Sequence, residues 1–388
     1  MSVNNMNFEQ AATLLNAVHS QVTGKTQIAP ADVSEFISVA QKTLKMGYDP
    51  VLNAISQVVG RTIFSVRPYS AKFGGIQADA QKWGSITRKL VLADKPLEDN
   101  QAFNLVDGQS VDMYEVNKPN ALQVNFYGAL EYSKSFTIFR SQLDNAFKGP
   151  DEFGRFMAMV TQNALDMIEQ TKETCARLTL DNFIAGKIAA NNGVIHLLTE
   201  YNQDVGGSYT ATTIKEAANW KDFVKWVYAR IATLTGLMTE RSEEYQIKVT
   251  GYDINRHTPF EDQKVYLFAD ILNAIDARVL ADTYNYKFIE YADVEAVGFW
   301  QSIENRDQIN IKPTWLQSDG TLTTGNAVTQ SNIMGVIFDD EALGYTTFNE
   351  FSGVTPMNVR GEYWNQYFNY VIRYWNDFTE KGLVLLLD

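Results

Sequence analysis

One long repeat of apolar positions dominates this chain and begins directly after Gly149-Pro150. Its members follow the three- and four-residue spacing of a helix; they are Phe153, Phe156, Met157, Val160, Ala164, Met167, Ile168, Thr171, Cys175 and Leu178. Pro150 suits the first helical position, and Asp151 and Glu152 suit its positive end. A helix from 151 to about Gly186 would be on the order of 50 Å long at 1.5 Å per residue, about three times the average length.

The residues before this helix read as strands. Residues 84–94 ("GSITRKLVLAD") and 120–139 ("NALQVNFYGALEYSKSFTIF") alternate between apolar and polar side chains, and a polar stretch separates them. This pattern predicts a long β-hairpin. Because an isolated hairpin is marginally stable, we expect it to project outward and to lie on another surface.

The two ends of the chain carry different patterns. Short helices are expected within residues 1–60, at 7–22, at 30–47 with Pro30 at its start, and at 49–60. Near the other end, Trp364, Phe368, Tyr370, Ile372, Tyr374 and Phe378 occupy even positions, which is the period of a strand with one buried face. "LVLLL" at 383–387 does not alternate and should be buried on both faces. The two segments are expected to form a central hairpin.

Residues 195–350 mix both kinds of pattern. Asn219 can cap a helix over 220–234, and a capping box at 258–261 is expected to open a helix through 265–284. Strands are expected at 245–254, 287–292, 310–317 and 332–340.

Charge and composition exclude several classes of protein. The net charge of -13 would repel a phosphate backbone, so direct nucleic-acid recognition is not expected. The first 20 residues lack the basic and apolar regions of a secretory signal, which favours cytoplasmic synthesis. No apolar run approaches the roughly 20 residues that span a bilayer. Cys175 is the only cysteine, which rules out an intrachain disulfide.

The sequence offers no convincing catalytic, cofactor or metal site. Its three histidines, His19, His196 and His257, share no ligand spacing. Cys175 lies on the apolar stripe of the long helix, which favours an inert buried thiol. The acidic cluster at 339–341 lacks the spacing of a calcium loop and is expected to be solvated surface. The C-terminal aromatics could stack on sugars, but their period of two favours a core or an interface instead.

Three stretches and the order of the segments resemble a known family. "RGEYWNQY" (360–367) is similar to a stretch near the end of major capsid proteins of short-tailed phages. The segments 118–138 and 48–64 also lie where such proteins keep comparable segments. The chain therefore resembles the tailed-bacteriophage major capsid protein, with its α+β Johnson fold.

The resemblance implies a division into domains. It gives an N-terminal helical arm at 1–60, an extended loop at 61–148, a spine helix with part of the peripheral domain at 149–204, an axial domain at 205–348, and C-terminal strands of the peripheral domain at 349–388. Many copies would assemble as hexamers and pentamers into an icosahedral head around double-stranded DNA, which is enclosed without sequence-specific binding. Scaffolding and portal proteins are the further partners that the family implies, with no membrane and no cofactor. The head would assemble in the host cytoplasm.

Two sets of residues are candidate sites under this interpretation. Charged side chains of the extended loop are expected to contact a neighbouring subunit: Arg88, Lys89, Lys95 and Lys118. Side chains of the aromatic strand are expected in the peripheral core: Trp364, Phe368, Ile372 and Tyr374. The alternatives are an encapsulin-like compartment shell of the same fold and, more remotely, a carbohydrate-binding protein or glycosidase.

Overall fold

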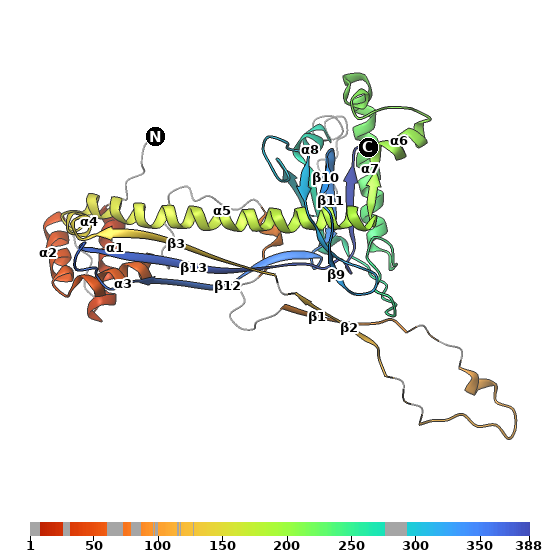
Figure 1. Ribbon diagram of the computed structural model, residues 1–388, viewed down its shortest axis with the longest axis horizontal. Coiled ribbons are helices and arrows are strands. Elements are labelled where there is room, and N and C mark those ends of the chain that lie inside the picture. The colour runs from red at the N-terminus through yellow and green to blue at the C-terminus, as the bar shows by residue number, and fades with distance from the viewer. Residues whose placement is uncertain are drawn as a thin grey trace.

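A computed structural model describes residues 8–25, 32–59, 73–78, 87–95, 97, 100–114, 116, 118–126, 128–275 and 293–388. Helix α5 (Pro150–Ala190) has 41 residues and runs along most of the molecule (Figure 1). This confirms the predicted long helix, which ends four residues later than expected because Asn191 closes it in the left-handed conformation (φ 49°). Among the described residues, no helix has the length and apolar character needed to cross a membrane.

A three-stranded antiparallel sheet follows the length of α5 (Figure 1). Its order is β12 (Leu343–Val354), β13 (Tyr363–Asn376) and β3 (Ala129–Phe139). The alternation of the aromatic strand is confirmed at its start, where Trp364 and Phe368 are buried and Tyr367 and Asn369 are exposed. One face of β13 therefore packs inward while the other meets solvent.

Three short helices gather at the N-terminal end of α5: α1 (Phe8–Thr23), α2 (Val33–Leu44) and α3 (Tyr48–Val59) (Figure 1). They confirm the expected helices, although Pro30 lies outside the described residues. Asp32 caps α2, because its side chain accepts a hydrogen bond from the backbone N–H of Glu35. With α4 (Arg140–Ala146) and Trp364 they enclose a separate hydrophobic core.

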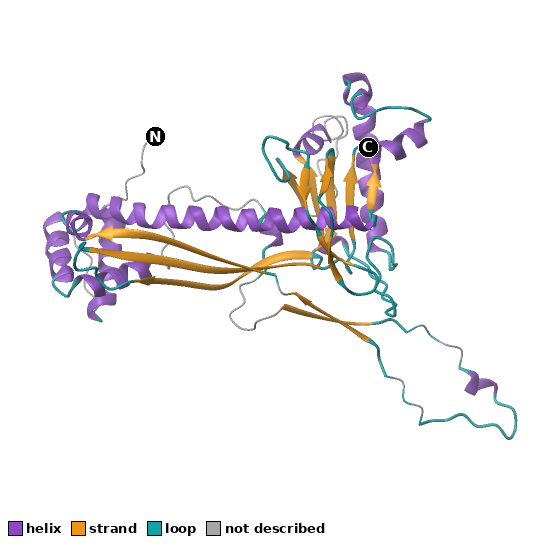
Figure 2. Ribbon diagram, viewed as in Figure 1, coloured by secondary structure: helices purple, strands orange, loops and turns teal. Residues whose placement is uncertain are grey.

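A five-stranded sheet lies at the other end of α5 (Figure 2). Its order is β4 (Val194–His196), β14 (Gly382–Leu386), β11 (Ile333–Asp339), β5 (Gln263–Phe268) and β6 (Asp293–Val297). Helices α6 (Leu197–Val205), α7 (Ala217–Thr239) and α8 (Ala269–Ile275) accompany it. The larger hydrophobic core surrounds this sheet.

The predicted C-terminal hairpin is wrong in its partners. Strand β14 is buried on both faces as expected, but it pairs with β11 and β4, whereas β13 pairs with β12 and β3. The turn at 377–381 carries the chain from one sheet to the other. As a consequence, β13 and β14, which both lie within the predicted range 349–388, belong to different sheets.

The capping box at 258–261 does not open a helix at 265, although α8 (Ala269–Ile275) lies within the predicted range 265–284 and residues 276–284 lie outside the described residues. Only a single 3-10 turn (Phe260–Asp262) follows it, and the next residues form β5. The hydroxyl of Thr258 donates to Asp339 Oδ2 (2.7 Å), which links it to the end of β11. The buried run of β-branched and aromatic side chains in β5 pairs with β11 and β6, so sheet formation overrides the local helix signal.

Other expectations for the middle of the chain are mixed. The strand at 332–340 is confirmed as β11, whereas residues 245–254 are irregular. The strand at 310–317 divides into β7 (Ile309–Ile311) and β8 (Thr314–Leu316), which pair with β10 (Val328–Gln330) and β9 (Leu322–Thr324). Asn219 lies inside the first turn of α7 and is not its cap. The expected strand at 287–292 lies outside the described residues.

A two-stranded ribbon projects away from the junction of the two sheets (Figures 1 and 2). Strand β1 (Thr87–Leu92) pairs antiparallel with β2 (Ala121–Phe126). The predicted hairpin is therefore shorter than expected. Its second strand divides near Gly128, and the part after this residue, β3, belongs to the three-stranded sheet. A side chain at Gly128 would lie 2.6 Å from the carbonyl oxygen of Tyr374, so the close approach at this division requires glycine.

Candidate functional site: the projecting arm

The arm, residues 87–126, exposes many apolar side chains to solvent. They are Leu90, Leu92, Leu97, Phe103, Leu105, Val106, Val111, Met113, Tyr114 and Val116. The exposed fraction of Leu97 is 102%, and that of Phe103 is 85%. Exposed apolar groups that gather on one projecting segment are typical of a surface that another molecule covers.

Alternation along β1 gives the arm two different faces. Arg88, Leu90 and Leu92 are exposed, whereas Lys89 and Val91 on the opposite face are partly buried. The register places Lys89 opposite Val124 in β2. One face of the ribbon therefore lies toward the body of its own chain, and the other remains open.

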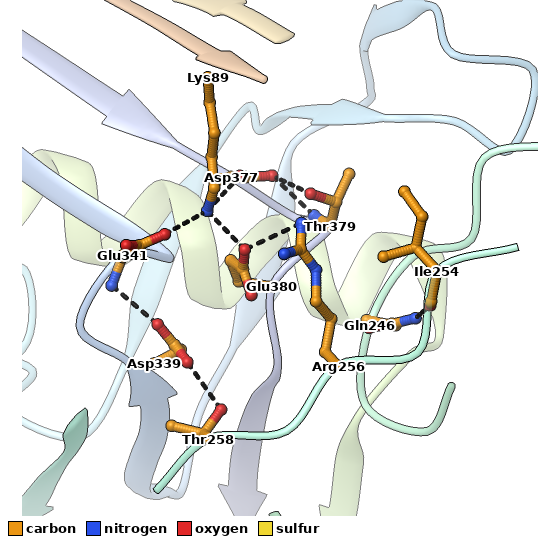
Figure 3. A network of polar contacts seen from close by, with 10 residues as sticks. All are labelled: Lys89, Gln246, Ile254, Arg256, Thr258, Asp339, Glu341, Asp377, Thr379 and Glu380. Atoms are coloured by element: carbon orange, nitrogen blue, oxygen red, sulfur yellow. Dashed lines mark hydrogen bonds and ion pairs between the residues drawn. The ribbon is translucent and has the colours of Figure 1, made fainter. Parts of the chain in front are cut away.

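Lys89 attaches the start of the arm to the body of the chain (Figure 3). Its Nζ lies 2.7 Å from Glu341 Oε2 and 3.2 Å from Asp377 Oδ2, and it also forms an ion pair with Glu380. Burial alone would lower the pKa of Lys89, but the carboxylates of Asp377, Glu380 and Glu341 outweigh it and raise this pKa. Lys89 therefore stays charged, and we call these four residues the near attachment.

Arg256 supplies a second cation beside the near attachment. Its Nη2 lies 2.9 Å from Glu380 Oε1, as an ion pair whose angles do not make a hydrogen bond. Burial raises the pKa of Glu380 even though Lys89 and Arg256 act in the opposite direction. Removing one cation would leave the buried carboxylates of Asp377 and Glu380 with less compensation of their charge, which is costly for buried groups.

A second set of contacts, the far attachment, holds the arm where β1 ends. Asp94 Oδ2 accepts hydrogen bonds from the backbone N–H (2.8 Å) and Nδ2 (3.2 Å) of Asn255, and Asp94 also forms an ion pair with Arg241. The Asn255 N–H lowers the pKa of Asp94. On the other strand, Asn120 Nδ2 donates to the carbonyl oxygen of Gly251 (3.0 Å). Both strands of the ribbon are thus bound to residues 241–255.

Sequence comparison decides what kind of protein carries this arm. A sequence profile of the family described as "Phi29-like phage major capsid protein" matches residues 13–379. The chain belongs to this family. The capsid protein is a structural component of the virion and not an enzyme, and it self-assembles into the icosahedral head of a tailed phage.

Solved structures share the fold of the capsid protein. The capsid structure of Staphylococcus phage Andhra has a TM-score of 0.56 and 11% sequence identity, covering 84% of this chain and 87% of that chain. A chain in the structure of the head fiber and inner core protein of native bacteriophage P68 has a TM-score of 0.55 and 10% identity, with the same coverage. These matches show a mixed α+β fold like that of phage capsids. A search of curated proteins finds no match.

The capsid protein places the predicted arm residues in two environments. Arg88, Lys95 and Lys118 are exposed. Lys89 is enclosed by carboxylates of its own chain, so its charge is already compensated within the subunit, and a contact of these four arm residues with a neighbouring subunit stays a prediction. Its position on the half-buried face of an alternating strand was the signal that could have separated it from Arg88.

The predicted aromatic-strand residues lie largely inside the capsid protein. Trp364, Phe368 and Ile372 are buried, and Tyr374 is partly buried. Trp364 belongs to the core of the N-terminal helices, while Ile372 belongs to the larger core. Phe368 stacks on Phe136, with ring centroids 5.8 Å apart.

Titratable groups of the capsid protein that resembled catalytic candidates have structural surroundings. His19 is buried and its Nδ1 lies 2.8 Å from the hydroxyl of Thr43. Burial raises the pKa of Cys175 to about 11, which keeps its thiol protonated. The described residues contain no group of three or more His, Cys, Asp or Glu side chains arranged to hold a metal ion.

Proposed function

We propose that the arm of the capsid protein lies over a neighbouring subunit in the head, and that hexamers and pentamers of the chain build that head. The exposed apolar side chains of the arm carry this proposal, because a two-stranded ribbon with an apolar surface needs a partner to cover it. A closed symmetric shell supplies such a partner to every copy.

We further propose that the fold is the Johnson fold. Within the expected range 61–148, the arm at 87–126 would be its extended loop, whereas β3 in the same range pairs with β13. Helix α5 would be its spine helix, and the three-stranded sheet, including β3, with α1–α3 its peripheral domain. The five-stranded sheet with α6–α8 would be the axial domain, whose loops meet around the symmetry axis of a capsomer. The pairing of β14 with β11 supports assigning residues 382–386 to the axial domain.

We propose that the shell encloses packaged DNA without binding it tightly or sequence-specifically. The net charge of -13 supports a weak interaction between the shell and the phosphate backbone. Scaffolding and portal proteins are proposed as further partners on family grounds. A strongly basic inner surface in a reconstruction of the shell would contradict the proposal about DNA.

Shortening the arm tests the proposed contact between subunits. Residues 95–119 are replaced by Asn-Gly, so that a three-residue loop, Asp94-Asn-Gly, joins Ala93 to Asn120, whose N–H and carbonyl oxygen pair (2.8 Å). We expect a folded chain with an unchanged helical circular-dichroism signal and, in electron microscopy, no closed shells. Normal shells from this variant would overturn the proposal.

A matched pair of triple variants tests which side chains are responsible. Leu97, Phe103 and Met113 are replaced by serine in one variant, and the exposed polar Asn104, Asp107 and Gln109 in the other. We expect the first variant to lose assembly and the second to retain it. Equal assembly by both would mean that the apolar surface of the arm does not form the contact.

A further inference from the structure

The irregular residues 240–256, here called the coupling segment, touch both the spine helix and the arm. The segment closes on itself where the backbone N–H groups of Ser242 and Arg256 donate to each other's carbonyl oxygens (2.9 and 3.1 Å). It contains every residue of the far attachment that does not belong to the arm: Arg241, Gly251 and Asn255. Arg256 links the same segment to Glu380 of the near attachment. Any shift of this segment therefore moves the points that hold the arm.

Two buried lysines bind the other side of the coupling segment. Lys187, near the C-terminal end of α5, donates its Nζ to the carbonyl oxygen of Tyr245 (2.7 Å). Lys381, just before β14, donates to the carbonyl oxygen of Glu240 (2.6 Å) and the hydroxyl of Ser242 (2.9 Å). Both residues have an exposed fraction of 0%. An irregular segment has few backbone partners of its own, so donors from outside it matter. Lys381 supplies one to the Glu240 carbonyl oxygen, and the Tyr245 carbonyl oxygen accepts from Lys187 and also from the backbone N–H of Gly382 (2.9 Å).

Burial disfavours the charged form of both lysines and therefore lowers their pKa values. Burial lowers the pKa of Lys187 to about 7, although the carboxylates of Asp377 and Glu380 act in the opposite direction. Burial also lowers the pKa of Lys381. A buried lysine is costly unless its donors are used. Three of the bonds from these two lysines go to the coupling segment, and one more runs from Lys187 Nζ to Asn192 Oδ1 (3.2 Å). Asn192, directly after α5, adds a hydrogen bond from its Nδ2 to the Gln246 carbonyl oxygen (3.0 Å).

We infer that the coupling segment fixes the direction of the arm relative to the spine helix in the single chain, before any neighbour is met. The near attachment holds β1 at Lys89, and the far attachment holds both strands at Asp94 and Asn120. Two separate points of contact fix the direction of the arm, whereas the arm could rotate about a single one. The segment that carries the far contacts is in turn bound to α5 through Lys187 and Asn192.

The inference deepens the proposed function by assigning a way to preset the arm, but its contacts all lie within one chain. It is therefore tested on the full-length chain at concentrations too low for assembly. Spin labels are placed at Gln109→Cys on the arm and Leu322→Cys on β9, both exposed, in a Cys175→Ala background. Double electron–electron resonance then gives the distribution of distances between the two labels.

We expect one narrow distribution for the otherwise unaltered chain. Lys89→Met and Asp94→Ala should each broaden it, because each removes one attachment. Arg88→Met is the matched control: it removes a cation from the adjacent, exposed position of the same strand and should leave the distribution unchanged. A broad distribution in the unaltered chain, or equal broadening by Arg88→Met, would overturn the inference.

Variants of the spine helix test the coupling itself. Lys187→Met lies outside the arm and its attachments, so broadening in this variant would show that the restraint passes through the coupling segment. If Lys187→Met reduces the helical circular-dichroism signal, Asn192→Ala replaces it. This change removes the bond to Gln246 and the bond that Asn192 Oδ1 accepts from Lys187 Nζ (3.2 Å), and it leaves the bond from Lys187 to Tyr245 in place. A narrow distribution in a folded variant of this pair contradicts coupling. Shell formation enters neither measurement, so failure of the proposed function would be seen separately.

Discussion

Trp364 donates its indole N–H to the carboxylate of Asp49, a residue 315 positions earlier in the chain. The contact joins β13 to α3, and the ring of Tyr48 packs beside the indole with a centroid distance of 5.7 Å. The exposed fraction of Trp364 is 0%. This side chain is therefore one of the contacts that join the N-terminal helices to the sheet that backs α5.

Replacing Trp364 tests how much this junction stabilises the chain. Trp364→Ala should lower the free energy of unfolding by about 3–5 kcal/mol and abolish assembly, because it removes a large buried aromatic. Trp364→Phe keeps most of the packing and loses the hydrogen bond to Asp49, which should cost about 1–2 kcal/mol. Urea unfolding followed by circular dichroism measures both. Normal shells from the alanine variant would show that the side chain is not essential to the core.

Two helical glycines should respond to alanine in opposite directions. A Cβ at Gly186 in α5 would lie 2.5 Å from the ring of Phe378, which stacks on Phe183. Overpacking of about 1–3 kcal/mol should exceed the gain in helix propensity, so Gly186→Ala destabilises the chain. At Gly236 in α7 a Cβ meets no described atom within 4 Å, so Gly236→Ala should stabilise by about 0.5–1 kcal/mol. Equal unfolding midpoints for the two variants would contradict this reading of α5.

Asp181 should make stability depend on pH. Its exposed fraction is 1%, and neither carboxylate oxygen has a hydrogen-bond partner among the described residues. Burial raises its pKa from 3.8 to about 7, although Arg177 acts against the shift. The folded state then binds a proton that the unfolded state has released between these values, so stability falls as pH rises from about 4 to 7.

Asp181→Asn removes this titration with little change of shape. The variant should match the unaltered chain near pH 4 and exceed its free energy of unfolding by a few kcal/mol above pH 7. Guanidinium unfolding at pH 4.5, 6 and 8 measures the difference. Other titrating groups, including Lys187, cancel in the comparison. A difference independent of pH would place the charged carboxylate in a solvated site instead.

The lone cysteine should be unreactive while the chain is folded. Cys175 is buried, and burial raises the pKa of its thiol to about 11. The thiolate is the reactive form, so a thiol reagent at pH 8 should label Cys175 only after denaturation. Mass spectrometry with and without guanidinium checks this. A cysteine introduced at exposed Gln109 is the positive control, and labelling of native Cys175 at a similar rate would contradict its burial.

Elements with a long, regular pattern were predictable from sequence. The apolar repeat of α5 and the alternation of β13 each extend over many residues, so a local exception does not hide the period. The strand at residues 263–268 was not predictable, because the capping box at 258–261 indicates a helix. These residues form a strand because they pair with β11 and β6. Tertiary contacts settle what local propensity leaves open.

The interaction partners of individual strands and side chains could not be predicted from the sequence. The apolar run "LVLLL" predicted a strand that is buried on both faces, but it does not indicate that this strand pairs with β11 and β4. Lys89 and Arg88 are adjacent and chemically similar, yet one is enclosed by carboxylates contributed from residues 341, 377 and 380. Such clusters depend on the packing of segments distant in sequence, which a local pattern does not specify.

Strand β14 lies between β4 and β11, and this position determines when the five-stranded sheet can be completed during synthesis of the chain. Ribosomes deliver residues 382–386 after every other strand of that sheet, so the hydrogen bonds of β14 with β11 and β4 form only after residue 386 has left the exit tunnel. Pairings between distant segments form slowly, and such intermediates expose apolar surface. Chains interrupted during synthesis would lack the strand that completes the sheet, and we expect quality-control proteases to remove them before they enter a growing shell.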